Sequence, residues 1–302
     1  MPATTTAEAA LPKSRTNRLT AIAEVLLAFA AVHAAFRAIK HFTDLGKLDV
    51  AAKLNFTPGA VMILFTVAIL VICHRSFAAY GLTFAEWKNG LKAGLLCGAL
   101  IIFVAALLTV LRIRHEPGRG PPGLTVGIGY GLVCAGGVLI LGWLWKRQEK
   151  LLSRVPPTAC FAVLIAVLCV PLLLAWRYGH PLLHAALTTL WLVVGAGVGE
   201  EMFYRGYVQS RINEAFGRPF RIKGLQFGVG LLLSTLLFGF LHALNSVDYF
   251  HGRWTFAWGF GIAALGTGAI FGWLRERTGS IIAGAVAHSI LDVLARASTM
   301  IP

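Results

Sequence analysis

Two adjacent carboxylates end a long uncharged stretch of this chain. Glu200 and Glu201 follow the run 181–199, whose only ionisable side chain is His184, and Arg205 comes one helical turn later. Residues four apart share a helix face, so we expect Glu201 to pair with Arg205. Glu200 then points about 100° away around an α-helix and cannot share that cation well. It stays free to bind water and take its proton as a general base.

Two imidazoles in later apolar segments extend this set. His242 lies one helical turn after Phe238, and His288 lies one turn before Asp292. Glu201 with Arg205, Phe238 with His242 and His288 with Asp292 each have the spacing of one helix face, and three such pairs in the C-terminal third suggest one shared polar pocket. We therefore expect Glu200, His242 and His288 to share one polar, water-filled cavity.

Each of these groups also has an ordinary structural interpretation. A lone histidine such as His242 is more often a packing residue, and the Glu201–Arg205 pair is more often an ion pair at the headgroup level. Glu24 and His33 stand alone in the first apolar block, so for them we favour snorkelling or a packing hydrogen bond. Ionisable groups at membrane depth are rare, and several together in the C-terminal third favour a functional site.

The composition sets the environment of these residues. The 302 residues are 57% hydrophobic and only 13% charged, with a mean hydropathy of +0.73. Soluble domains carry about 25% charged residues, so the chain is predicted to be an integral membrane protein. Its apolar blocks have the length of spanning helices, and they lack the alternation of barrel strands.

We predict an all-α, polytopic membrane protein of eight to nine transmembrane helices with an intramembrane polar cavity. The candidate spans are bounded by turn signals such as the "EPGRGPPG" that begins at residue 116. They are 19–38, 58–73, 93–111, 124–145, 158–176, 182–199, 227–247, 256–274 and 280–295.

The basic residues predict the orientation. With the N-terminus inside, the cytoplasmic tail and loops collect most of the 27 Lys and Arg residues, although the first loop, with Arg37 and Lys40, opposes this pattern. Residues 1–17 are expected to be a disordered cytoplasmic tail, 18–177 the N-terminal transmembrane helices and 178–302 the catalytic transmembrane core. The expected location is the bacterial inner membrane.

The net charge and the cysteines exclude other classes. The charge of +14 is spread beside apolar blocks, which favours contact with lipid headgroups and argues against nucleic acid. The five cysteines contain no CxxC, so we interpret them as small buried hydrophobes that form neither disulfides nor a metal site.

Three ordered motifs resemble those of a known family. "EEMFYR" (Glu200, Glu201, Arg205), "FGFLH" (Phe238, His242) and "HSILD" (His288, Asp292) resemble the EExxxR, FxxxH and HxxxN/D motifs of the CAAX-protease and bacteriocin-processing (CPBP, or Abi) family. The Ras-converting CAAX endopeptidase belongs to this family. The resemblance covers about residues 181–298.

The resemblance implies an intramembrane endopeptidase and a role for each matched residue. Glu200 would activate water and His242 would help to hold it. His288 and Asp292 would stabilise the oxyanion, while Glu201 and Arg205 would shape the site, with Phe238 as a supporting residue. The family often has Asn where Asp292 stands, and an ionised carboxylate would repel an oxyanion, so we favour Asp292 as the residue that orients His288.

The resemblance implies no metal cofactor, and the residues favour the same view. No HExxH helix occurs in the sequence. Two histidines on separate helices plus carboxylates leave a divalent metal such as zinc as the alternative.

One geometric condition follows from the helical rise. If Glu200 ended its span at the cytoplasmic surface, His242 would lie over 20 Å away on an antiparallel neighbour. The two can meet only if the sixth helix continues past Arg205 toward Phe216, and if the seventh begins outside the hydrocarbon. Arg211 and Glu214 would then lie in a water-filled cleft.

Three function classes remain open at this stage. The favoured one is an intramembrane endopeptidase that hydrolyses a peptide bond of a membrane-attached protein or peptide, whether or not it is prenylated. The alternatives are a non-catalytic scaffold or immunity protein on the same fold, and a proton-coupled transporter. The absence of an evident inverted repeat disfavours the transporter.

Overall fold

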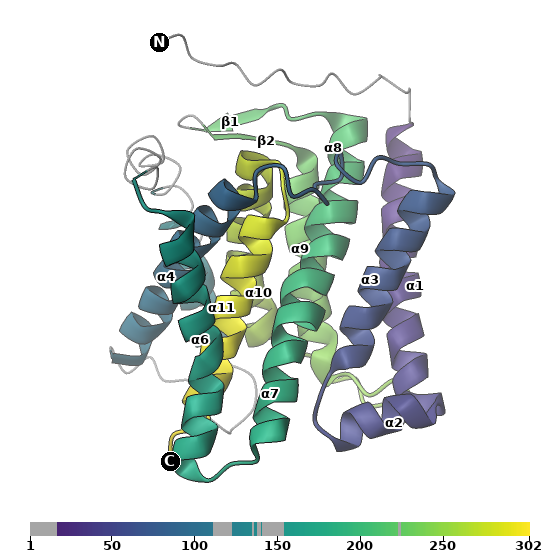
Figure 1. Ribbon diagram of the computed structural model, residues 1–302. Coiled ribbons are helices and arrows are strands. Elements are labelled where there is room, and N and C mark those ends of the chain that lie inside the picture. Colours follow the sequence, from purple (N-terminus) through teal and green to yellow (C-terminus); the bar gives the residue numbers. More distant parts are fainter. Residues whose placement is uncertain (1–16, 111–122, 135, 138–139, 141–153, 223–224) are drawn as a thin grey trace.

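The computed structural model describes residues 17–110, 123–134, 136–137, 140, 154–222 and 225–302. The predicted tail therefore lies outside the described residues. The described chain forms a bundle of helices that run between two ends of the molecule (Figure 1). Its first half contains α1 (Arg18–Phe42), α2 (Asp44–Ala51), α3 (Phe56–Ile72), α4 (Trp87–Val110), a helix at Leu124–Cys134 and α6 (Pro157–Tyr178).

The second half contains one long helix and four further elements. The long helix comprises α7 (Leu182–Trp191), η1 (Leu192–Glu200), η2 (Met202–Gln209) and α8 (Ser210–Phe216). A short antiparallel hairpin follows, with β1 (Phe220–Ile222) paired to β2 (Leu225–Phe227). The chain ends with α9 (Val229–Ala243), the short η3 (Leu244–Ser246), α10 (Trp258–Thr278) and α11 (Ile282–Ser298).

The all-α prediction is confirmed, apart from the hairpin. Each of the nine predicted spans coincides with a helix, although much of 135–145 in the fourth span lies outside the described residues. Five helices are long and apolar enough to cross a membrane: Arg18–Phe42, Trp87–Ala106, Pro157–Tyr178, Leu182–Phe216 and Val229–Ser246. The count of eight to nine transmembrane helices stays a prediction.

The two ends of the bundle differ in what they carry. We call the end with β1 and β2 the hairpin end; the chain also enters α1 there and links α3 to α4 there (Figure 1). The other, C-terminal end carries α2, the α6–α7 turn and the last residues of α11. Loops that we predicted to be cytoplasmic thus share the hairpin end, while their side of the membrane stays a prediction.

The helix from Leu182 to Phe216 is continuous over 35 residues. This confirms that it continues past Arg205, and it leaves Glu200 near its middle. Its segments η1 and η2 have the wider turn of a π-helix, which is rare and concentrates at functional sites. Neighbouring side chains on such a turn diverge less than on the α-helix assumed from the sequence.

Glycines bring other backbones close to this widened segment. A Cβ built on Gly59 of α3 would lie 2.3 Å from the Cα of Gly195, and one on Gly197 would lie 2.1 Å from Oγ of Ser289 on α11. Only hydrogen fits at such contacts. The glycine-rich run "GAGVG" therefore lets α3 and α11 pack directly on η1.

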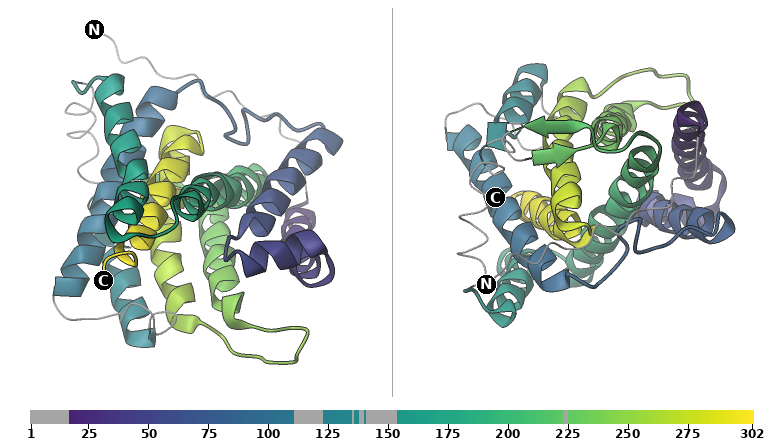
Figure 2. Two further views of the ribbon diagram at one scale, coloured as in Figure 1. Left: turned by 60° about the horizontal axis from the view of Figure 1, so that its bottom comes forward. Right: turned by 90° about the horizontal axis from the view of Figure 1, so that it is seen from above.

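Helices α10 and α11 occupy the interior, while α6 lies at the periphery (Figure 2). α11 packs against α4, η1, α6 and α10. Large apolar side chains of α6, including Phe161, Ile165 and Trp176, are exposed, as expected for a helix that faces lipid. Of the inner pair, α11 carries His288 and Asp292, the polar residues of the last motif. Three cysteines are buried as predicted, but Cys73 and Cys169 are exposed, so that prediction is wrong for these two.

Candidate active site

Glu201 and Arg205 form an ion pair inside the bundle. Nη1 of Arg205 lies 3.1 Å from Oε1 of Glu201, and both side chains are 0% exposed. Nη2 of Arg205 also donates to the carbonyl oxygen of Gly268 on α10 (3.1 Å). The predicted pairing is confirmed. The helix continues beyond the pair to Phe216, while the depth of the pair in the membrane stays a prediction.

His288 lies between the two adjacent carboxylates. Its Nδ1 donates to Oε1 of Glu201 (3.2 Å), and its Nε2 lies 4.0 Å from Oε2 of Glu200. Glu201 thus contacts both Arg205 and His288, a second role that the sequence did not predict. The wider π-helical turn explains why both glutamates face one ring.

Oε2 of Glu200 is buried and has no hydrogen-bond partner within the described part of the chain. The side chain as a whole retains 16% exposure. A carboxylate oxygen without a partner in such a place is able to accept a proton from water. Glu200 therefore remains free of Arg205, as the sequence analysis predicted.

Asp292 reaches the same imidazole one turn further along α11. Its Oδ2 lies 3.5 Å from Nε2 of His288, and its side chain is 27% exposed. The ring of His288 also stacks on Phe271 of α10, with 4.8 Å between centroids and 20° between planes. Phe271 was missed from the sequence because it is one apolar residue among many in its helix.

Phe238 connects the second histidine to this cluster. Its ring lies 4.4 Å from that of His242 and 5.8 Å from that of His288, measured between centroids. Nδ1 of His242 donates to the carbonyl oxygen of Phe238 (2.8 Å). Because a carbonyl oxygen only accepts, Nδ1 carries the hydrogen, and neutral His242 presents Nε2 as an acceptor. Arg205 also lies over the Phe238 ring, 4.3 Å from its centroid.

The helices that carry these contacts coincide with a known family. Residues 182–294, from the start of α7 into α11, match the model of the family described as type II CAAX prenyl endopeptidase Rce1-like. This segment is therefore similar to Rce1-like CAAX endopeptidases, and we call it the Rce1-like domain. No curated protein and no solved structure matches the chain. The match agrees with the motif resemblance and with its range.

A polar network ties α1 to the Rce1-like domain at the hairpin end. Glu24 pairs with Arg75 (2.5 Å) and with Arg211 of α8 (2.8 Å), and it accepts a hydrogen bond from Tyr207 (2.8 Å). Burial alone would lower the pKa of Arg75, but its hydrogen bonds to Glu24 hold that pKa above its ordinary value. Glu24 is thus a packing residue with partners, in line with the structural interpretation.

The cleft predicted at Arg211 and Glu214 is not formed. Arg211 is 5% exposed and lies 3.3 Å from Glu214, which in turn accepts a hydrogen bond from Tyr80. Burial raises the pKa of Tyr80 above its usual range, so its hydroxyl stays protonated and donates. The sequence could not show this because the partners come from the distant α1 and from the α3–α4 loop.

Glu276 of α10 forms a second set of polar contacts at the same end of the Rce1-like domain. Its side chain is 1% exposed, and it accepts hydrogen bonds from Gln209 and Asn213 and pairs with Arg218. Gln209 also donates to the carbonyl oxygen of Gly272. Gly268 and Gly272 of α10, four residues apart, thus both accept hydrogen bonds at their carbonyl oxygens from side chains of η2. In the sequence, the only signal for Glu276 is a carboxylate between two arginines at the end of an apolar block.

Two cavities flank the Rce1-like domain, and the predicted catalytic residues line neither. One, of about 200 Å³, is lined by apolar residues of α6, η1 and α11 next to Ser289. The other, of about 110 Å³, lies at the C-terminal end. The water-filled cavity shared by Glu200, His242 and His288 stays a prediction. Over the described residues, no group of three His, Cys, Asp or Glu side chains is arranged to hold a metal ion.

Proposed function

We propose that the protein is an intramembrane endopeptidase in which Glu200 activates the hydrolytic water. The observation that carries this proposal is the environment of Glu200. Its carboxylate has an unpartnered oxygen 4.0 Å from Nε2 of His288, near the middle of a 35-residue helix of an Rce1-like domain. The polar groups described near it are Glu201 on its own helix and His288 on α11.

The reaction follows from the donors and acceptors available. Glu200 takes a proton from water, and the hydroxide adds to the carbonyl carbon of the scissile peptide bond. His288, as an imidazolium with a hydrogen on each ring nitrogen, donates from Nε2 to the resulting oxyanion, while neutral His242 accepts from the water through Nε2. Collapse of the tetrahedral intermediate breaks the C–N bond, and Glu200 returns its proton to the amine that leaves.

Glu201, Arg205 and Asp292 act by positioning in this scheme. Glu201 holds Nδ1 of His288 at 3.2 Å and is itself held by Arg205 at 3.1 Å. Asp292 lies near the other nitrogen at 3.5 Å and orients the ring. The N–H donor of His288 is then oriented before the substrate binds. Such preorganised donors are usually the largest contribution to electrostatic catalysis.

The substrate class is a membrane-attached protein or peptide, and the chemistry proceeds without a resident metal. Entry from the hairpin end corresponds to a cytoplasmic approach if the N-terminus is inside. The basic residues of that end, including Arg18, Arg218 and Arg221, support this orientation because cytoplasmic loops are enriched in Lys and Arg.

The test is a comparison of new protein termini. Purified wild type and Glu200→Gln are reconstituted with membrane proteins of the source cell, and termini are identified by mass spectrometry. We expect wild type to generate termini that Glu200→Gln forms about 10²–10⁴ times more slowly, the usual contribution of a general base. Glu86→Gln is the matched control, since Glu86 is exposed and its side chain accepts a hydrogen bond from its neighbour Asn89, away from the motif residues. Equal termini from both enzymes would refute the proposal.

A further inference from the structure

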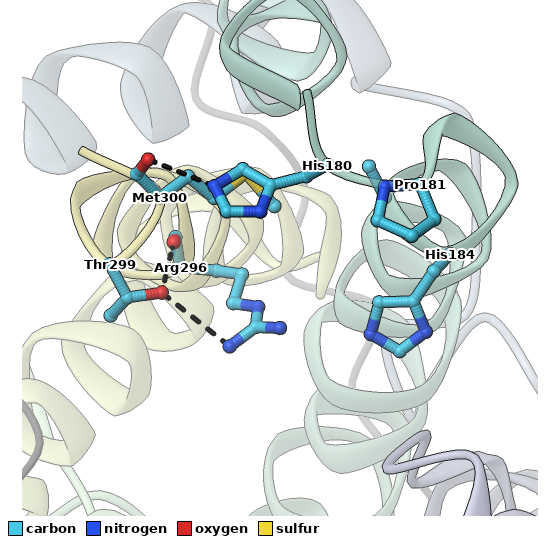
Figure 3. Close-up of a pocket in the computed structure, with 7 residues that line it drawn as sticks. His180, Pro181, His184, Arg296, Thr299 and Met300 are labelled. Carbon is cyan, nitrogen blue, oxygen red and sulfur yellow. Dashed lines mark hydrogen bonds between the residues drawn. The ribbon is translucent and has the colours of Figure 1, made fainter. Parts of the chain in front are cut away.

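A cavity of about 110 Å³ lies at the C-terminal end, between the start of α7 and the end of α11. His180, Pro181, His184, Ala185, Arg296, Thr299 and Met300 line it. Figure 3 shows the guanidinium of Arg296 directed from α11 toward the gap, with the ring of His184 on α7 across from it. This site is separate from the Glu200 cluster, and the proposed hydrolysis makes no use of it.

The lining contains one permanently charged group, the guanidinium of Arg296, and no acidic side chain. Two imidazoles and one guanidinium face the space, and none of the seven residues is Asp or Glu. Buried or half-buried cations usually lie beside a carboxylate, because their desolvation is otherwise uncompensated. The missing negative charge therefore has to come from a ligand or from solvent.

The donors of Arg296 are largely unused. Its Nε is buried without a hydrogen-bond partner in the described structure, and its Nη1 has one contact, to Oγ1 of Thr299 at 3.5 Å. A guanidinium offers five N–H donors in a planar fork that matches the oxygens of phosphate or carboxylate. His180 is held differently, by a contact of 3.1 Å between its Nε2 and the carbonyl oxygen of Met300.

The backbone adds positive potential at the same place. Gly179, in the left-handed conformation with φ of 73°, ends α6, and α7 begins after Pro181 with no side-chain cap. The first N–H groups of α7 thus lack intrahelical partners and carry the positive end of the helix dipole. Imidazole, guanidinium and amide donors converge on one small space.

We propose that this cavity binds the phosphate of an anionic phospholipid headgroup. The position of the cavity supports a lipid as the source of this phosphate. Trp176 and Tyr178, in the last turn of α6, are exposed close to it in the sequence, and exposed aromatic side chains are typical of the membrane interface. The α9–α10 loop and the start of α10 lie at the same end of the bundle (Figure 1), and Trp254 of that loop and Trp258, the first residue of α10, are exposed as well. Arg296 forks onto the phosphate oxygens, and His184 donates from the facing helix.

Binding is measured without any peptidase assay. Protein in detergent is titrated with phosphatidylglycerol, with phosphatidylcholine, whose phosphate is neutralised by choline, and with inorganic phosphate. Retained lipid is counted by native mass spectrometry, and thermal unfolding reports stabilisation. We expect phosphatidylglycerol to be retained and to raise the unfolding temperature of wild type. Arg296→Gln is expected to weaken this binding at least about tenfold, and Arg296→Lys to weaken it less.

Arg177→Gln is the matched control, because it removes the same charge from the same end of the molecule without touching the cavity lining. If it weakens binding as much as Arg296→Gln, the lipid responds to overall charge and the site is refuted. Equal stabilisation by inorganic phosphate supports the anion site with a free phosphate as its source. Absence of binding by either probe overturns the proposal. Should Arg296→Gln fail to fold, His184→Gln replaces it with the same expected direction.

Discussion

His242 and His288 contact the same phenyl ring, that of Phe238, at centroid separations of 4.4 and 5.8 Å. Phe238 also supplies the carbonyl oxygen that sets the tautomer of His242. One residue thus spaces the two imidazoles and decides which nitrogen of His242 is an acceptor. The tautomer of His242 thus depends on Phe238, whereas the position of His288 depends on its carboxylate neighbours.

His242→Asn and His288→Asn are expected to separate these roles. The Asn amide at 242 lacks the acceptor nitrogen that faces away from Phe238, so the rate should fall about 10²-fold or more with little change in unfolding temperature. His288→Asn loses contacts to Glu201, Glu200 and Asp292 together, so it should lower both rate and stability. Turnover and thermal unfolding of both variants provide the measurement. His251→Asn, exposed in the α9–α10 loop, is the control and should match wild type.

Breaking the buried ion pair should be costly. Arg205→Met leaves the carboxylate of Glu201 without its arginine partner where both side chains are 0% exposed, so we expect a loss of about 3–5 kcal/mol in the free energy of unfolding. Adding Glu201→Gln to Arg205→Met should restore part of this loss, because neither position of the pair then carries a charge. Denaturant unfolding in detergent measures both. Asp44→Asn, at an exposed pair with Lys47, should cost less than about 1 kcal/mol. A similar cost at both pairs would contradict the described burial.

Gly284→Ala should impair catalysis more than folding. A Cβ at this position would lie 2.4 Å from Oε2 of Glu201, so the flexible carboxylate has to move away from His288. We expect turnover to fall at least about tenfold while the unfolding temperature changes little, since the displaced atoms end a side chain. Gly129→Ala has open space around it and is the matched control. Unchanged turnover in Gly284→Ala would show that the Glu201–His288 contact does not position the ring.

Much of this arrangement could be predicted from the sequence, for identifiable reasons. The four-residue spacing places Glu201 beside Arg205, and the long uncharged run places Glu200 inside an apolar helix. The contact between Glu201 and His288 could not be predicted, because it depends on the π-helical turn of η1 and η2 and on the room left by Gly284. Local spacing cannot encode either feature.

The polar network at the hairpin end was misjudged for a different reason. Arg211 and Glu214 looked like residues that need water, since their own segment offers no other partner. Their partners Glu24 and Tyr80 come from α1 and from the α3–α4 loop. Long-range ion pairs of this kind leave no periodic signal in a single sequence.

Glu24→Gln tests that network. The change leaves Arg211, 5% exposed, without its closest carboxylate and weakens the hydrogen bonds from Arg75 and Tyr207. We expect the free energy of unfolding to fall by about 1.5–3 kcal/mol, the range for hydrogen bonds to charged groups. The proposed chemistry should persist at temperatures where the variant remains folded. A loss of turnover without loss of stability would instead give Glu24 a role in the reaction.

Chelation separates the glutamate mechanism from its zinc alternative. We expect turnover to be unchanged after incubation with EDTA or 1,10-phenanthroline and dialysis. The reason is that catalysis is assigned to Glu200, His242 and His288 without a Lewis acid. Inactivation that zinc reverses would favour the metal alternative, and inactivation that no metal reverses would indicate damage by the chelator.

The contact between Gly59 and Gly195 has a consequence for how the protein tolerates change. Neither residue has a side chain that takes part in chemistry, yet a single added methyl group at 59 would strike the backbone of η1 at 2.3 Å. In a saturation mutagenesis screen, Gly59 should rank beside Glu200 among the least replaceable positions, whereas an added Cβ at Gly195 would come closest to the side chain of Trp191, at 3.0 Å, and should be tolerated better. Protein abundance would separate Gly59 from Glu200, because substitutions at Gly59 should deplete the folded enzyme while Glu200→Gln leaves the protein folded but inactive.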